Sequence, residues 1–301
     1  MTPFARPPDA SRLAALINGY SIEITPRDAA RTVDFRAILP AATRIYIAHI
    51  DETPVEELLT TARRLIDQGF EVMPHFPARN IRDVAMLRDW VRRYQAMGVT
   101  GALLLAGNRK RPVGQFRDSM QLLQSGAFEG FKRLHVAGHP EGSRVIDPDG
   151  SDVNAMAALQ WKQAFAERSG IEMAIVTQFC FDTESFIRWA KRIRKAKNTL
   201  PIHVGVAGPA RLQTLLKYAL LCGIGPSLQM PKERSADITR LLLPYEPGGF
   251  LTELAGRRAQ NPDIGIAQIH FFPFGGVSAT ASWATRHGAH PDPLGAGTAH
   301  A

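Results

Sequence analysis

Several polar side chains that could take part in catalysis stand within short apolar runs or directly after them. Glu23 lies between Ile22 and Ile24, inside the first of these runs. A carboxyl group buried in such a run has a raised pKa and can serve as a general acid near neutral pH. A salt bridge to one of the many arginines is the structural alternative. The residues alone leave both interpretations open.

Further candidates follow the later apolar runs, and we expect reactive groups at their C-terminal ends: His49, Asp51, His75, Asn108, Arg109, His139, Glu141, Gln178, Asp182 and the loop Phe271–Gly276. Three histidines in such positions would suit a metal site. The first run has no His-x-His pair, however, and the acidic residues are not at ligand spacing from the histidines. We therefore predict no catalytic metal.

The elements that must position these groups form a regular alternation. Eight short apolar runs are predicted to be strands, and longer helical patterns separate them. The strands are expected at residues 20–24, 44–49, 70–74, 101–105, 134–137, 173–178, 202–206 and 264–271. Eight strands with helical connections predict an α/β protein with a single (β/α)8, or TIM, barrel. Reactive groups in this fold lie at the C-terminal strand ends.

Two of the helices have recognisable start signals. The pattern over residues 55–66 is preceded by Thr53 as the predicted N-cap, with Glu56 completing a capping box. The pattern over residues 81–94 follows Asn80, the predicted N-cap of that helix. The long gap between the last two strands must hold more than one helix.

Length and composition limit the organisation of the chain. It has 301 residues, 45% of them hydrophobic, and only two cysteines, which excludes a disulfide scaffold. We expect an N-terminal extension at 1–18, a barrel domain at 19–287 and a disordered tail at 288–301. Segment 223–247 covers the cleft or mediates homo-oligomer formation, and the sequence does not decide between these roles. Without a signal peptide or an apolar run of membrane length, we expect a cytoplasmic protein with no membrane partner.

The net charge of +8 favours anionic partners, including nucleic acid, phosphorylated cofactors and polycarboxylates. The most basic run is expected on one helix and contains Lys191, Arg192, Arg194, Lys195 and Lys197. Such runs are usually solvated outer faces, and no nucleic-acid motif accompanies this one. Nucleic-acid binding is therefore not predicted as the primary function, although it remains the alternative from a different functional class.

An ordered set of segments resembles the methylenetetrahydrofolate reductase family from about residue 21 to residue 274. They are Ser21-Ile22-Glu23-Ile24-Thr25-Pro26, Pro74-His75-Phe76, Leu105-Ala106-Gly107-Asn108, Val136-Ala137-Gly138-His139-Pro140-Glu141-Gly142, Thr177-Gln178-Phe179-Cys180-Phe181-Asp182, Pro201-Ile202-His203-Val204-Gly205-Val206 and Cys222-Gly223-Ile224-Gly225-Pro226-Ser227. The resemblance implies a flavin-dependent barrel oxidoreductase of one-carbon metabolism and methionine biosynthesis. It would reduce 5,10-methylenetetrahydrofolate to 5-methyltetrahydrofolate.

The resemblance also implies roles for individual residues. Glu23 would be the proton donor, with Asn108 and Gln178 completing the catalytic set. Gln178 and Phe181 would bind the folate substrate. FAD would bind non-covalently near His49, His75, Gly107, Asn108, Ala137, His139 and Lys162. NADH or NADPH would supply the hydride, and the sequence assigns no ribose-recognising residue that chooses between them.

The chain departs from the family pattern near the expected flavin. Ala106 and Asn108 stand where the family usually has Arg and Asp, and Ser143 falls about where a His is common. His139 replaces a Tyr, and Ala166 occupies the place of a second lysine. These departures keep a second mechanism open, in which hydride passes directly from the nicotinamide to the folate without flavin.

Overall fold

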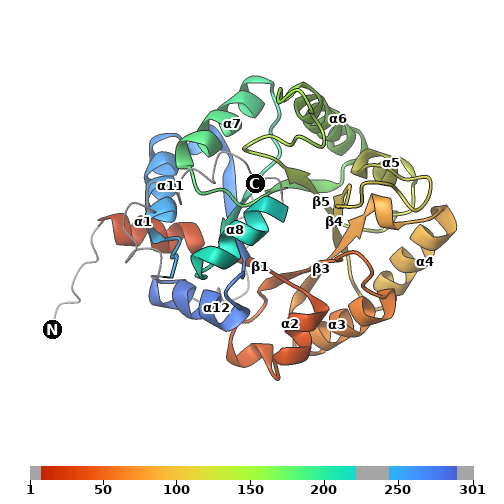
Figure 1. Cartoon of the computed structure of the whole chain (residues 1–301), viewed down its shortest axis with the longest axis horizontal. Helices are drawn as coiled ribbons and strands as arrows, with labels where there is room; N and C mark the ends of the chain where they lie inside the picture. Colours follow the sequence, from red (N-terminus) through yellow and green to blue (C-terminus); the bar gives the residue numbers. More distant parts are fainter. Residues whose placement is uncertain (1–7, 222–243, 290–301) are drawn as a thin grey trace, which may run out of the picture.

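Eight parallel strands close into a barrel in the computed structural model, which describes residues 8–221 and 244–289. Each strand pairs with the next along the chain, and β8 pairs with β1 (Figure 1). The strands are β1 (Ser21–Ile24), β2 (Arg44–Ile47), β3 (Glu71–Pro77), β4 (Gly101–Leu105), β5 (Arg133–Gly138), β6 (Glu172–Thr177), β7 (Ile202–Ala207) and β8 (Ile266–Phe272). The predicted α/β class and (β/α)8 barrel are confirmed.

Helices surround the barrel, and most of them pack apolar faces against the outward-facing side chains of the strands (Figure 1). They are α1 (Pro8–Ile17), α2 (Pro26–Arg31), α3 (Val55–Asp67), α4 (Val84–Gln95), α5 (Ser119–Gln124), α6 (Val153–Ser169), α7 (Thr183–Lys195), α8 (Leu212–Leu221), α11 (Gly248–Gln260) and α12 (Val277–Arg286). Short 3₁₀ helices add η1 (Phe35–Ala37), η2 (Ala78–Asn80) and η4 (Pro262–Ile264). The predicted second helix in the last long connection is confirmed by α8 and α11.

Both predicted N-caps are wrong. Helix α3 begins at Val55 with Pro54 at the N-cap position and no side-chain cap bond, so Glu56 is one residue too early for a capping box. The Glu56 carboxylate instead pairs with Arg93, 2.6 Å away. Helix α4 is capped by Asp83, whose side chain accepts a hydrogen bond from the Met86 backbone nitrogen at 2.8 Å. A carboxylate nearer to the first helical turn thus takes the place predicted for Asn80.

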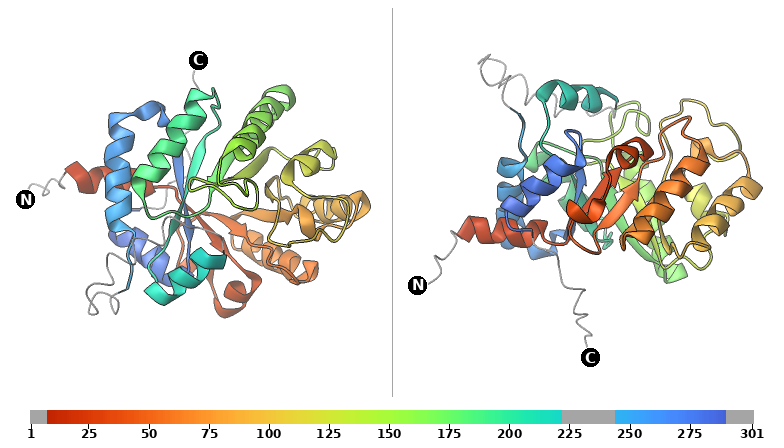
Figure 2. Two further views of the ribbon diagram at one scale, coloured as in Figure 1. Left: turned by 45° about the horizontal axis from the view of Figure 1, so that its top comes forward. Right: turned by 90° about the horizontal axis from the view of Figure 1, so that it is seen from below.

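The N-terminal region contains a helix that the sequence analysis did not predict. Helix α1 packs against α11 and β8 and buries Leu13, Leu16 and Ile17. Figure 2 shows it at the end of the barrel opposite α8. Most of segment 223–247 and nearly all of the tail lie outside the described residues, so the predictions made for them remain predictions.

Charged side chains fill the N-terminal end of the barrel. Register pairs Arg44 with Glu71 and Arg133 with Glu172. The Arg44 Nε atom lies 3.0 Å from Glu71 Oε2, and Arg133 Nε lies 2.8 Å from Glu172 Oε1. Arg133 also contacts Glu71. These ion pairs, called the floor of the barrel below, form one connected set that joins strands β2, β3, β5 and β6.

Above the floor, buried aromatic and histidine side chains occupy the centre. The Tyr46 hydroxyl lies 2.6 Å from His135 Nδ1, and the rings of His135 and His203 meet edge to face at 4.8 Å. The Tyr46 ring packs edge to face on His270 at 4.5 Å. Burial lowers the pKa of His203 and of His270 to about 3, so both imidazoles are neutral at pH 7. The interior is therefore a packed polar core rather than a channel.

Candidate active site

Glu23 and two histidines meet at the C-terminal side of this core. Glu23 projects inward from β1, between the outward-facing Ile22 and Ile24. Its Oε2 atom lies 3.3 Å from Nε2 of His75 on β3 and 3.9 Å from Nε2 of His270 on β8. A hydrogen bond of 3.0 Å between Ser21 Oγ and His270 Nδ1 fixes the orientation of the second ring. The three strands therefore bring two imidazoles to one carboxyl group.

Burial controls the protonation of this cluster. It raises the pKa of Glu23, an effect that His75 opposes and the negative charge of Asp28 reinforces. Burial also lowers the pKa of His75 to about 4. His75 is consequently neutral at pH 7, and its contact with Glu23 is not a pair of full charges. Within the part of the chain that the structure describes, the ionic partners of Glu23 are these histidines and no arginine.

The loops after β2 and β4 meet beside His75. His49 packs against the Trp90 ring at 5.3 Å, and burial lowers its pKa to about 4. Arg109 lies 3.7 Å from Asp51, measured from Nε to Oδ1, and both charges act on His49. His49 in turn lowers the pKa of His75. These residues extend the polar cluster from Glu23 toward the β4 loop.

Gly107 and Asn108, which are predicted to lie near a flavin, belong to the loop after β4, and this loop packs closely against β3. Gly107 has a φ of +87°, and a Cβ there would lie 2.9 Å from the Pro77 Cβ. Both observations require glycine, because a side chain would be strained and would collide with Pro77. The next residue, Asn108, is exposed. The structure thus presents Asn108 at the surface of the loop.

A second cluster lies at the end of β5, where Ala137 precedes Gly138 and the chain continues to His139. Lys162 of α6 is buried, with 7% of its surface exposed, and burial lowers its pKa to about 8. Burial and the Lys162 charge together lower the pKa of His139 to about 4. Among described residues, no hydrogen bond or ion pair reaches the Lys162 amine. A buried ammonium group without a protein partner is suited to an anionic ligand.

Gln178 and Phe181 follow β6. The Gln178 backbone nitrogen donates to the carbonyl oxygen of Gly138 at 2.9 Å, which ties this strand end to β5. From the other side, the Gly205 nitrogen donates to Thr177 Oγ1 at 2.8 Å. A Cβ at Gly205 would lie 2.2 Å from the Thr177 carbonyl oxygen, so only glycine allows β7 to approach here.

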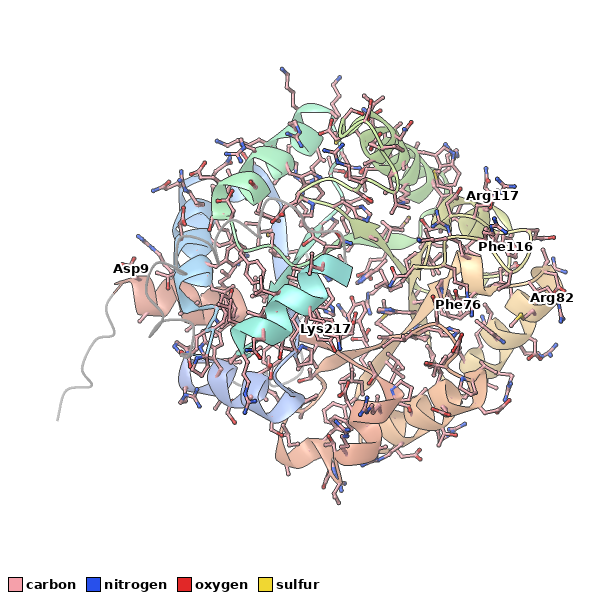
Figure 3. All side chains as sticks on the ribbon, in the orientation of Figure 1. Asp9, Phe76, Arg82, Phe116, Arg117 and Lys217 are labelled. Carbon is pink, nitrogen blue, oxygen red and sulfur yellow. The ribbon has the colours of Figure 1, made fainter. Side chains whose placement is uncertain are left out.

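Aromatic rings line the same side of the barrel end. Phe181 is buried against Tyr245, with ring centroids 5.3 Å apart. Tyr218 of α8 stacks on Phe274 at 4.3 Å, and Phe274 lies nearly parallel to Phe272. Helix α8, which carries Lys217, crosses this end of the molecule in Figure 3. These rings form an apolar wall beside the polar cluster.

The structure thus brings Glu23 and His75 together, links His49 to them, and places His139 beside Lys162 on the β5 side. Sequence reasoning missed Ser21 and His270, which orient the Glu23 environment, and it missed Tyr218, which stacks on the predicted loop at Phe274. Alternation along β1 and β8 was the available signal. Ser21 shares the inward side with Glu23, and His270 shares it with Phe272. Their contact across 249 positions in sequence depends on barrel closure.

Polar atoms at these strand ends test whether a cofactor would fit. His49 Nδ1 and Asn80 Oδ1 are buried without a hydrogen-bond partner among the described residues, and Arg109 Nε has only its ion pair with Asp51. Unpaired buried polar groups cost about 1–3 kcal/mol each, so such groups suit a polar ligand. These atoms, and the Lys162 amine on the β5 side, are of the types that bind ring heteroatoms and phosphate groups.

In residues 8–221 and 244–289, no three His, Cys, Asp or Glu side chains are arranged to hold a metal ion. The helices of these same residues include none that is long and apolar enough to cross a membrane.

Solved structures that resemble this chain in fold share little sequence with it. A phosphonomutase candidate from Burkholderia cenocepacia J2315 is 11% identical, with a TM-score of 0.46 over 88% of this chain and 92% of that chain. Phosphoenolpyruvate phosphomutase from Streptomyces platensis subsp. rosaceus is 13% identical, with a TM-score of 0.42 over 88% and 80%. Likenesses at this level do not bear on function.

The family comparison is more informative. The family model of methylenetetrahydrofolate reductase matches residues 57–239, more than half of the chain. The matched region includes His75, the β4 loop, the cluster of His139 and Lys162, and Gln178. Glu23 lies before the matched region and His270 lies after it. In the closed barrel, Glu23 contacts both His75 and His270. The chain therefore belongs to the methylenetetrahydrofolate reductase family.

Proposed function

We propose that the protein reduces 5,10-methylenetetrahydrofolate to 5-methyltetrahydrofolate, with NAD(P)H as the hydride donor and bound FAD as the carrier. Family membership supports a folate-related reductase. The observation that carries the finer proposal is the position of Glu23, whose carboxyl group is mostly enclosed, with 21% of the side chain exposed, and lies between two neutral histidines at the C-terminal end of the barrel.

The chemistry of the substrate requires an acid at this place. The bridging methylene carbon becomes an electrophilic iminium when one of its two carbon–nitrogen bonds breaks. The departing amine nitrogen takes a proton, and the carbon then accepts a hydride. Glu23 has the raised pKa that keeps a carboxyl proton available near neutral pH. The hydrogen bond between Ser21 and His270 orients the imidazole that lies beside the carboxyl group of Glu23, the proposed proton donor.

The residues proposed to hold FAD are His49, His75, Gly107, Asn108, Ala137, His139 and Lys162. When bound, the flavin would accept a hydride from NAD(P)H and then transfer it to the methylene carbon of the folate. Lys162 supplies a buried positive charge for phosphate oxygens, and its low exposure limits the water that competes for it. The unpartnered His49 Nδ1 offers a hydrogen bond to a ring or ribose atom.

Direct hydride transfer from the nicotinamide to the folate is the second candidate mechanism. It is favoured by the loop after β4, where Ala106 and Asn108 bring no charged side chain to a flavin ring. Both mechanisms use Glu23 as the proton donor. They differ in whether the purified protein needs flavin.

The test is to purify the protein and measure its flavin absorbance together with its NAD(P)H oxidation in the presence of methylenetetrahydrofolate. The proposal expects yellow protein whose activity falls when FAD is removed and returns when FAD is added. Colourless protein with full activity that does not respond to FAD supports direct transfer. Absence of reductase activity in FAD-loaded protein would reject both mechanisms.

Gln178→Ala is expected to weaken both half-reactions if Gln178 contacts nicotinamide and folate in turn. A side-chain amide can donate and accept hydrogen bonds, so one residue can serve two different heterocycles. Loss of one hydrogen bond predicts roughly a three- to tenfold rise in KM for each substrate. Steady-state kinetics with each substrate varied separately measures this. Unchanged KM values for both would remove Gln178 from the site.

A further inference from the structure

The loop between β4 and α5, residues 106–118, gathers positive charge at the C-terminal end of the barrel. It contains Arg109, Lys110, Arg111 and Arg117. Arg109 pairs with Asp51, whereas Lys110 and Arg111 are exposed and have no acidic partner in the described chain. The loop thus carries more positive charge than the neighbouring carboxylates neutralise.

This loop has a defined conformation, because it is bonded along its length to residues 77–82. The Arg79 guanidinium donates to the carbonyl oxygens of Arg109 at 3.1 Å and Arg117 at 3.0 Å. The Val113 nitrogen donates to the Arg79 carbonyl oxygen at 3.0 Å. At Gly114, a Cβ would lie 1.8 Å from the Arg82 carbonyl oxygen. Figure 3 shows Arg82 and Arg117 on this same side of the molecule.

The basic loop adjoins the proposed reaction site. Arg109 contacts Asp51, and both act on His49. His49 acts on His75, which lies 3.3 Å from Glu23. Polar groups therefore lie between the proton donor and Arg109 of the loop. A ligand that reacts near Glu23 and extends toward Arg109 would bring its far end to the loop that carries Lys110 and Arg111.

The donor chemistry of the loop distinguishes the two nicotinamide cofactors. Proteins that bind NADH commonly offer a carboxylate to the ribose 2′-hydroxyl, whereas an arginine accommodates the 2′-phosphate of NADPH. Here Asp51, the acidic residue next to Arg109 of the loop, is already paired with that arginine. A phosphate monoester carries a charge of about −1.5 to −2 at pH 7. The fork of Arg111 and the ammonium group of Lys110 match that charge.

We propose that Lys110 and Arg111 bind the 2′-phosphate of NADPH, so that this protein prefers NADPH to NADH. The proposal rests on the proposed function, because it assigns the hydride donor of the same site. Other anions, such as a chain of γ-linked glutamates on a folate, are alternative occupants that the experiment separates from the phosphate.

The experiment titrates the full-length protein with adenosine 2′,5′-bisphosphate and with adenosine 5′-phosphate, using calorimetry. A Lys110→Gln/Arg111→Gln double variant tests the loop. A Lys191→Gln/Lys195→Gln variant removes the same charge from exposed positions on α7 and is the matched control. We expect the loop variant to bind the bisphosphate about 10- to 100-fold more weakly. The control should keep its Kd, and adenosine 5′-phosphate should bind all three proteins alike.

The proposal would be overturned by an unchanged bisphosphate Kd in the loop variant, or by equal affinity of the unchanged protein for both nucleotides. Penta-γ-glutamate is titrated in the same way, and a loop variant that loses affinity only for this peptide would also overturn the proposal. Kinetics separates this proposal from the proposed function. Loop-dependent bisphosphate binding without reductase activity would reject the reductase function alone. Reductase activity whose KM for NADPH is unchanged in the loop variant would reject the loop assignment alone.

Discussion

Glu23→Gln is expected to reduce the rate of methylenetetrahydrofolate reduction by about 10²–10⁴, because removal of a general acid typically costs that much. The amide is similar in size to the carboxyl group and keeps hydrogen-bonding capacity toward His75 and His270, but it has no acidic proton to give. Hydride transfer from NAD(P)H to flavin needs no such proton and should largely survive. Stopped-flow measurement of the two half-reactions separates these effects.

The pH dependence adds a second signature. Burial raises the pKa of Glu23, and the protonated form is the active acid. Folate reduction should therefore be constant at pH values below this raised pKa and should fall as pH rises through it. The glutamine variant should lack this fall. A matched Glu57→Gln variant, at an exposed position on α3, should keep both the rate and the pH profile.

Two results would count against the role of Glu23. A Glu23→Gln variant that is folded and reduces folate at the normal rate would show that another group gives the proton. A variant that fails to fold would indicate a structural role. In that case, the unchanged protein can still be tested, because its folate half-reaction must show the fall with pH.

Lys162→Met is expected to weaken FAD binding by about one to two powers of ten, because a charge-assisted hydrogen bond contributes about 1.5–3 kcal/mol. The same change should stabilise the protein without cofactor. Burial lowers the Lys162 pKa to about 8, so charging this amine costs the folded state on the order of 3 kcal/mol relative to the unfolded state. Methionine fills a similar volume without that cost.

The sign of the pH effect follows from the lowered pKa. Between about pH 8 and the ordinary lysine pKa, the unfolded state binds more protons, so the stability of the cofactor-free protein rises with pH. Lys162→Met should remove this rise. Denaturant titrations at several pH values, with Lys191→Met as the exposed control, measure it. Unchanged FAD affinity in Lys162→Met, determined by flavin fluorescence, would contradict the cofactor role.

The strands and their order were predictable because each strand forms a local apolar run, and barrel closure follows from the number of alternations. The helix starts were less predictable. Thr53 and Asn80 have suitable side chains, but extended Pro54 separates Thr53 from its helix, and three residues separate Asn80, the end of η2, from α4. Helix α1 escaped prediction because its apolar positions become informative only when α11 provides a surface for them.

The site shows the same division. Glu23 was recognisable from its two isoleucine neighbours, since a carboxyl group within an apolar strand is an unusual local feature. His270 was not recognisable, because its relation to Glu23 and Ser21 arises only when β8 closes against β1. The proton affinity of Lys162 likewise depends on how completely the surrounding helices and strand ends exclude water, which one segment of sequence does not record.

The ion pairs of Arg44, Glu71, Arg133 and Glu172 lie across the N-terminal end of the barrel. Above them, Tyr46 and the neutral histidines fill the interior, so reactants and products must share the route at the C-terminal strand ends. Under the proposed function, an oxidised nicotinamide must depart before a folate can take its place. A large excess of either reactant should then inhibit binding of the other, and the turnover rate should be highest when neither reactant is in large excess.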